Sequence, residues 1–454
     1  MKIGFSKIDI TPPTGITMCG QLQAPESKGA ESPLYATCLC IEDNHVKMAL
    51  LSCDLLMITN EFAKEINEAS PVKVIIGATH THSGPSTVNI FGGKANESYL
   101  KDLKNNVLKS IKEAFENRTE ADLFYSKDLL KGWAFNRRFI MSDGTIETHP
   151  LKKNPHIIDK EGPDSEDLHV LWAENKDGKI SGGAIIFGCH GTVMERSNQF
   201  ISSDFPGQCA EYLAGKFNAP FLYLQSACGN IGQVDSLESS KYEIGKEWAQ
   251  KMGVAIGKKA ESNIRRGGIQ LKSPRNIKSK IVKISRRKIP SELLQWAGRH
   301  ENDRFPIPEL SNYGAEKYNE LLDGKASLEA IFRSRFWAGF YANEIKTKER
   351  DCSKEPRMPF NISMMNFGKN LAIVALPCEL FVEWQNQIIR ESPFENTIVI
   401  ELANGWNGYV PTEKAFLRRG GYETKEVTSS ILVPEAGNMI CEKVKEMFFK
   451  QGFQ

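Results

Sequence analysis

Apolar runs separated by short polar turns divide much of the chain into strand-like segments. Two pairs of neighbouring runs are joined by a few polar residues, a pattern typical of β-hairpins. The pairs span residues 35–58 and 168–190, with turns at Asp43-Asn44 and Asp177-Gly178. Three further apolar runs predict additional core strands, at residues 220–229, 371–376 and 396–402.

Helical periodicity is clearest in residues 97–117, where apolar side chains recur every three or four positions. The stripe that they form consists of Leu100, Leu103, Val107, Ile111 and Phe115. Three more segments are predicted as helices, at residues 206–217 (opened by Pro206), 241–264 and 379–391.

This succession of strands and helices predicts an α/β fold. We find no repeat and no flexible linker, so we expect one large domain over residues 1–454, with a mixed β-sheet core flanked by helices. Residues 276–348 are more polar and have a helical pattern. We therefore expect the region of about 265–350 to form a helical insertion or cap.

Composition narrows the class of protein. The 454 residues are 41% hydrophobic and 25% charged, with a formal net charge of +2, which gives no reason to expect nucleic acid as a partner. The apolar runs are far shorter than the roughly 20 residues of a membrane span, and the first residues lack the apolar segment of a signal peptide. Ten scattered cysteines without a CxxC pair indicate reduced, buried thiols. We expect a cytoplasmic protein without stable membrane insertion.

Four apolar runs lead into a side chain that could bind a metal ion. These side chains are His80, His190, Glu379 and Tyr409. Ligands and catalytic groups of α/β proteins gather just past strand ends, where loops converge on a rigid sheet. Imidazole nitrogen and carboxylate oxygen suit zinc. His82 follows His80 by two residues, so in a strand it would share the same face and reach the same cavity.

Each of these residues also has a plainer interpretation. His190 alone fits a hydrogen-bonded core histidine as well as it fits a ligand. Glu379 opens a predicted helix, where a carboxylate stabilises the helix dipole. Tyr409 alone fits an ordinary half-buried tyrosine. Only the conjunction of these residues at strand ends indicates a site.

Seven short motifs occur in the order seen in neutral ceramidases. They are THTHSGP (79–85), FNRR (135–138), FGCHGT (187–192), SSDFPG (202–207), LQSACGNIG (224–232), LPCE (376–379) and NGY…GGYE (407–423). The chain resembles the catalytic domain of that family over nearly its whole length, least clearly at about 265–350. We expect no C-terminal immunoglobulin-like domain.

The resemblance implies one Zn²⁺ per chain and assigns residues to two roles. The implied zinc ligands are His80, His190, Glu379 and Tyr409. The side chains implied to line the reaction centre, polarise the scissile carbonyl and stabilise the oxyanion are His82, Arg137 and Tyr422. Both roles make chemical sense, since zinc is a Lewis acid and aimed donors stabilise a developing oxyanion.

The sequence departs from the family at one important position. Neutral ceramidases carry a Gly-Asp-Val-Ser-Pro-Asn-like segment whose serine is implicated as nucleophile, and Gly232 stands in its place here. Water activated by zinc could attack directly, or another group could replace the serine. The candidates for that replacement are Ser226, Cys228 and Asp204. Asp204 fits a base and fits equally well a cap of the helix at Pro206, whereas Cys228 would need a depressed pKa.

We therefore expect a zinc-dependent hydrolase that cleaves an amide or ester bond by zinc-activated water. Its substrate would be a small molecule, an N-acyl amide, an ester or a sugar-like compound. Trp133 and Trp406 lie beside site segments, where they could stack on such a substrate or simply pack in the core. Two alternatives stay open: a zinc-dependent lyase or isomerase acting on a sugar or hydroxy acid, and a catalytically inactive ligand-binding homologue, which Gly232 permits.

Overall fold

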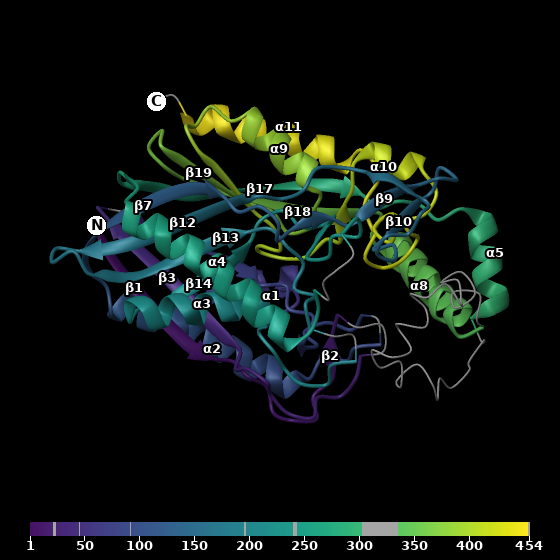
Figure 1. The fold of residues 1–454 in the computed structure, drawn as a ribbon, viewed down its shortest axis with the longest axis horizontal. Coiled ribbons are helices and arrows are strands. Elements are labelled where there is room, and N and C mark those ends of the chain that lie inside the picture. The colour runs from purple at the N-terminus through teal and green to yellow at the C-terminus, as the bar shows by residue number, and fades with distance from the viewer. Residues whose placement is uncertain are drawn as a thin grey trace.

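The computed structural model describes residues 1–20, 24–44, 46–90, 92–194, 197–238, 243–301 and 335–452. These residues form four layers, in which two β-sheets stack face to face and helices cover both outer faces (Figure 1). The helices bordering the larger sheet are α1 to α4, and those covering the smaller sheet are α9 and α11.

The larger sheet has nine strands in the described residues, in the order β14-β13-β12-β7-β1-β3-β4-β5, with β16 paired to β7. Their bounds are β1 Lys2–Asp9, β3 Tyr35–Asp43, β4 Val46–Cys53, β5 Lys73–Ala78, β7 Thr119–Leu129, β12 Asp167–Asn175, β13 Ile180–Phe187, β14 Phe221–Gln225 and β16 Ile269–Gln270. The pairs β4–β5 and β13–β14 are parallel, whereas β3–β4 and β12–β13 are antiparallel, so the sheet is mixed. Its edge strand β14 also contacts β3, β4 and β5, which shows that the sheet is strongly curled.

The second sheet has four strands in the order β17-β18-β19-β21. Their bounds are β17 Pro274–Ser285, β18 Arg357–Phe367, β19 Leu371–Ala375 and β21 Thr397–Ile400. The pair β19–β21 is parallel and the other two pairs are antiparallel. This sheet closes the core over the larger sheet.

Short strands and helices complete the described part of the chain. The short strands are β2 Met18–Cys19, β6 Gly84–Pro85, β8 Phe135–Asn136, β9 Arg138–Met141, β10 Ile146–Thr148, β11 Ile157–Lys160, β15 Ile231–Gly232, β20 Glu379–Leu380 and β22 Tyr409–Val410. The helices are α1 Asn60–Ala69, α2 Glu97–Glu116, α3 Asp204–Phe217, α4 Lys246–Arg266, α5 Ser291–His300, α8 Arg335–Lys354, α9 Val382–Arg390, α10 Glu413–Leu417 and α11 Ala436–Gly452. Several of the short strands pair across loops at the strand ends, where they fix the side chains described below.

The core strands are apolar on both faces because both faces are covered. In β4, Leu50 packs between the two sheets, where it belongs to one cluster with Phe367 and Ile373 of the second sheet. Its neighbours Ala49 and Leu51 point the other way, into the cluster formed with α1 and α2. Successive side chains of a strand face opposite sides, so a strand buried on both sides reads as a continuous apolar run.

Most of the predicted elements are confirmed, and so is the mixed α/β fold with a large mixed sheet flanked by helices. Both hairpins form, as β3–β4 and β12–β13. Helices occupy the three segments predicted at 97–117, 206–217 and 241–264, although α3 begins at Asp204 and α4 begins at Lys246. The sequence did not predict that the core contains a second sheet stacked on the first.

The helical prediction for residues 276–348 is wrong in part. Residues 274–285 form β17, which pairs antiparallel with β18. This strand lies at the edge of its sheet and leaves half of its side chains exposed, so its polar composition hides the strand period. Helices α5 and α8 agree with the prediction, and residues 302–334 lie outside the described residues.

All ten cysteines are buried and unbridged, as the sequence indicated. They act as small apolar side chains of the core, which is the usual role of a free buried cysteine. Within the described ranges, we find no helix that combines the length and the apolar character needed to cross a membrane.

Candidate metal centre

The loops that follow β5 and β13 bring three histidines together. His80 lies two residues past β5, and His190 lies three residues past β13. The backbone N–H of His82 donates to the carbonyl of Gly191 at 2.9 Å, which joins the two loops. His80 has a φ of 65°, a left-handed conformation that is strained for a histidine and that turns its ring out of the strand direction. Such strain is maintained where surrounding structure fixes it, as it does here.

Each of the three imidazoles is held by a backbone carbonyl at its Nδ1 atom. The carbonyls are those of Leu56 for His80 (2.8 Å), Gly20 for His82 (2.8 Å) and Cys228 for His190 (2.7 Å). A carbonyl can only accept a hydrogen bond, so Nδ1 carries the proton in every ring and Nε2 keeps its lone pair when the ring is neutral. This arrangement is typical of metal-binding histidines, whose second nitrogen is fixed by a partner outside the metal site.

The three Nε2 atoms face one another and two further oxygen donors. His80 Nε2 lies 3.4 Å from Nε2 of His82 and 3.4 Å from Oε2 of Glu379. His190 Nε2 lies 3.3 Å from the same Glu379 oxygen and 3.3 Å from the hydroxyl of Tyr409. Within the described residues, the three histidines form a group of the size that holds a metal ion.

The donor set fits a cation. Oε1 of Glu379 accepts a hydrogen bond from the indole N–H of Trp406 at 2.8 Å, whereas Oε2 is buried without a hydrogen-bond partner. Burial, followed by the neighbouring His80, lowers the pKa of His82 to about 3, and burial beside Arg137 lowers that of His190 well below its usual range. Neutral imidazoles then present lone pairs toward a carboxylate, an arrangement that only a positive charge stabilises.

A buried ion-pair network contacts the hydroxyl of Tyr409 through Arg137. Arg137 donates to the Tyr409 hydroxyl at 3.2 Å and to the carbonyl of Gly229 at 2.9 Å, and its Nε donates to Glu423 at 2.8 Å. Glu423 also accepts from Arg138 at 2.6 Å. The carboxylate therefore holds both arginines, and Arg137 places a fixed positive charge beside the centre.

Tyr422 is half-buried and lies next to Tyr409 in the same network. Its ring meets that of Tyr409 edge to face, with centroids 5.9 Å apart. The hydroxyl of Ser429 donates to the Tyr422 oxygen at 3.4 Å, which leaves the phenolic proton available for another acceptor. Tyr422 is thus placed to donate to a molecule that enters beside Tyr409.

The plainer interpretations of Glu379 and Tyr409 do not hold. Glu379 lies in the short strand β20, which pairs with β22 at Tyr409, and helix α9 begins only at Val382. Its carboxylate therefore does not lie in the first turn of the helix. Tyr409 is 5% exposed and its ring stacks on that of His190.

The structure does not bring Asp204 into this group. Its carboxylate accepts hydrogen bonds from the backbone N–H groups of Val193, Met194 and Phe205. Asp204 is the first residue of α3, after Ser203 at the cap position, and has a φ of 54°. These contacts fix the loop after His190 to the start of α3, so the cap interpretation is wrong in detail and the base interpretation gains no support.

Neither of the other candidate nucleophiles is suited to attack. The Ser226 hydroxyl is buried and donates to Gln385 at 2.6 Å. Burial, reinforced by the nearby Glu401, raises the pKa of the Cys228 thiol well above its ordinary value, so the thiolate is not formed near neutral pH. The contribution of Cys228 to the centre is its carbonyl, which holds His190.

Sequence reasoning missed two functional contacts. Trp406 was considered only as a stacking or core residue, yet its N–H orients Glu379. Glu423 follows Tyr422 directly in the GGYE motif, and an acidic residue beside a site tyrosine was the available signal. Trp133, by contrast, packs against the core cluster of α3 and α4, with Trp248 5.6 Å away between ring centroids.

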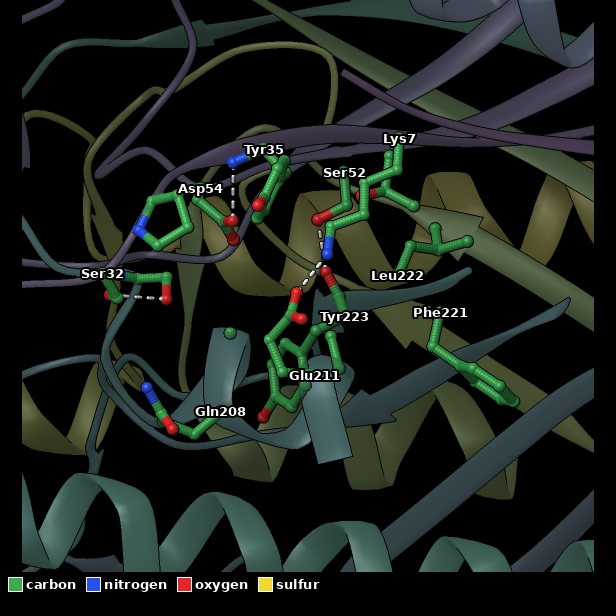
Figure 2. Close-up of a pocket in the computed structure, with 15 residues that line it drawn as sticks. Lys7, Ser32, Tyr35, Ser52, Asp54, Gln208, Glu211, Phe221, Leu222 and Tyr223 are labelled. Atoms are coloured by element: carbon green, nitrogen blue, oxygen red, sulfur yellow. Dashed lines mark hydrogen bonds and ion pairs between the residues drawn. The ribbon is translucent and has the colours of Figure 1, made fainter. Parts of the chain in front are cut away.

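Figure 2 shows a second polar hollow, which lies beside the strands rather than at the histidine cluster. Its volume is about 30 Å³, room for about one water molecule. Lys7 and Glu211 form an ion pair across it. Asp54, which accepts from the Tyr35 N–H at 2.9 Å, has its pKa raised to about 7 by burial. A hollow of this size cannot hold a substrate.

The first half of the chain matches a family of known proteins. Residues 1–223 match the family described as neutral/alkaline non-lysosomal ceramidase, N-terminal, and this range contains His80, His82, Arg137 and His190. Through these residues, the first half of the chain is similar to neutral ceramidases. A neutral ceramidase of Pseudomonas aeruginosa is 25% identical over 170 residues, which cover 35% of this chain and 24% of that protein. The match therefore spans about a quarter of the relative's length.

Two solved structures share the fold along nearly the whole chain. The crystal structure of neutral ceramidase from Pseudomonas aeruginosa has a TM-score of 0.71 at 17% identity, over 100% of this chain and 75% of that one. A ceramidase complexed with C2 has a TM-score of 0.69 at 18% identity, over 98% of this chain and 74% of that one. The neutral ceramidase fold thus extends past residue 223, to the segments that carry Glu379 and Tyr409.

Proposed function

We propose that this protein belongs to the neutral ceramidase family and is a zinc-dependent hydrolase that cleaves an amide or ester bond. The observation that supports it best is the buried Oε2 of Glu379, which has no hydrogen-bond partner and faces the Nε2 atoms of His80 and His190. These three residues and Tyr409 are the proposed ligands of one zinc ion. Bound zinc would supply a Lewis acid and lower the pKa of water from 15.7 to about 7.

The remaining side chains divide the other tasks by their chemistry. His82 is the most exposed of the three histidines, and its Nε2 faces the centre as an acceptor, which suits it to accept a hydrogen bond from an attacking water and to position that water. Arg137 stabilises negative charge that develops on the substrate oxygen, and Tyr422 donates to that oxygen. The hydrogen bond from His82 Nδ1 to Gly20 therefore changes the expected role of His82, from oxyanion donor to acceptor for the attacking water.

The substrate class follows from the relatives. The matched protein is a neutral ceramidase, so we propose an N-acyl lipid amide of the ceramide type as the first substrate to test, with esters next. No nucleophilic side chain stands at Gly232, and Ser226 and Cys228 are both engaged elsewhere, so we propose that water attacks the carbonyl directly.

The test is product analysis in water labelled with oxygen-18. The purified protein is incubated with an N-acyl sphingosine and with a short-chain ester, and the products are examined by mass spectrometry. We expect one labelled oxygen in the released carboxylic acid, and no product from a His80→Ala variant. Products without label would favour the lyase or isomerase alternative, and no product from any compound would favour the inactive binding protein.

A further inference from the structure

A histidine that lies outside the metal-binding group occupies the space beside Gly232. A methyl group added to Gly232 would lie 2.7 Å from Cε1 and 3.4 Å from Nε2 of His149. Real side chains do not approach that closely, so a residue with a β-carbon does not fit at position 232 while His149 keeps its place. The absence of a side chain at position 232 is thus explained by the imidazole of His149, which packs on Gly232.

Gly232 lies close to two residues whose side chains reach the centre. It ends the short strand β15, and the backbone N–H of His190 donates to the carbonyl of its neighbour Ile231 at 3.3 Å. On the other side, the added methyl group would lie 3.7 Å from Cβ of Arg137. His190 and Arg137 both contact the hydroxyl of Tyr409. The ring of His149 therefore lies close to Arg137 and His190, two residues whose side chains reach the centre.

The backbone holds His149 in this position. Its N–H donates to the carbonyl of Arg137 at 2.8 Å, and its φ of 54° lies in the left-handed region. A residue in this conformation just before a proline is strained, and such strain persists where the surrounding structure fixes it. The half-buried ring is thus directed toward Gly232 instead of toward solvent.

We propose that His149 is the general acid of this centre. This role depends on the proposed hydrolysis. Imidazole is the side chain best able to hold and release a proton near neutral pH. The roles proposed above leave the protonation of the leaving group without a side chain, and His149 lies close enough to the centre to supply it.

The proton balance is closed. In the proposed step, a water oxygen bonds to the carbonyl carbon and one water proton passes to solvent. The carbon–nitrogen or carbon–oxygen bond then breaks, and His149 gives its proton to the leaving nitrogen or oxygen. A proton from solvent then reprotonates His149, so one water is consumed for each bond cleaved.

The test compares leaving groups in a His149→Ala variant. An amine is a poor leaving group that needs protonation, whereas nitrophenolate leaves without it. We expect kcat for an N-acyl amide to fall by about 10²-fold or more, kcat for a nitrophenyl ester to change less than tenfold, and zinc content to stay at the wild-type level. The matched control is His156→Ala, which removes an exposed histidine of the same segment. If the alanine variant does not fold, His149→Gln replaces it.

A second measurement does not depend on activity. Gly232→Ser is expected to lower the thermal midpoint when His149 is present and to have little effect in a His149→Ala background, where the space is free. Equal losses on amide and ester, loss of zinc, or equal effects of Gly232→Ser in both backgrounds would overturn the proposal. A wild-type protein inactive toward both compounds would instead refute the proposed function, and the role of His149 with it.

Discussion

Replacement of His190 by alanine is expected to lower hydrolytic activity by about four orders of magnitude. Loss of the proposed zinc site would remove the Lewis acid and the acidified water that zinc would supply, a contribution of several kcal/mol to transition-state stability. His190 is singled out because its Nε2 contacts both Glu379 and Tyr409. The effect is measured as kcat/KM on the best amide or ester substrate, with zinc in excess, so that a merely weakened site is refilled.

The matched control for this variant is His169→Ala. His169 is also buried, but its Nδ1 contacts the hydroxyl of Tyr125 within the larger sheet, away from the cluster. We expect the control to lose stability and to keep zinc and activity per folded molecule. A His190→Ala protein that retains more than a tenth of the wild-type rate would show that this cluster is not the reaction centre.

Replacement of Glu423 by alanine is expected to destabilise the fold by about 3–5 kcal/mol, because it leaves buried positive charges without their partner. Glu423 and Arg138 are fully buried and Arg137 is 4% exposed, so water cannot compensate. Burial alone would raise the pKa of Glu423, but the two arginines outweigh it and lower the pKa to about 2. The stabilisation is therefore complete above the ordinary glutamate pKa and is lost as pH falls toward 2.

Urea unfolding at pH 7 and at lower pH measures this effect. Glu423→Gln keeps the shape and one acceptor, so we expect a smaller loss than for alanine. As a surface control, Glu113→Ala removes an exposed pair with Lys109 on α2 and is expected to cost less than about 1 kcal/mol. A loss of less than 1 kcal/mol for Glu423→Ala, or a difference between variant and wild type that does not shrink on acidification, would contradict this account of the network.

The sequence predicted the parts of the fold and site that depend on local pattern. His80 and His190 were found because each follows a long apolar strand. The hairpins at Asn44 and Gly178 were found because asparagine and glycine favour tight turns, and both residues adopt the positive φ that such turns require. Strand β17 was missed, since an edge strand with exposed polar side chains carries little periodicity. The stacking of the second sheet was missed as well, because a run buried between two sheets looks the same as one buried between a sheet and helices.

The contacts that complete the site are distant in sequence, and local pattern does not contain them. Glu379 is oriented by Trp406, and His80 is held by the carbonyl of Leu56. The role of His149 depends on a space beside Gly232 that only the folded chain defines. Sequence therefore gives residue types at strand ends, whereas the hydrogen-bond partners that fix each tautomer and orientation come from the packing of both sheets.

The measurement that tests the central claim most directly is the metal content of the native protein, by mass spectrometry. We predict about one zinc per chain, sharply reduced by His80→Ala and by Tyr409→Phe, and unchanged by His82→Ala, which removes a side chain assigned to the attacking water. Zinc lost equally in the His82 variant would make the three histidines the ligand set. A native protein without zinc, or with zinc indifferent to His80, would contradict the proposed centre.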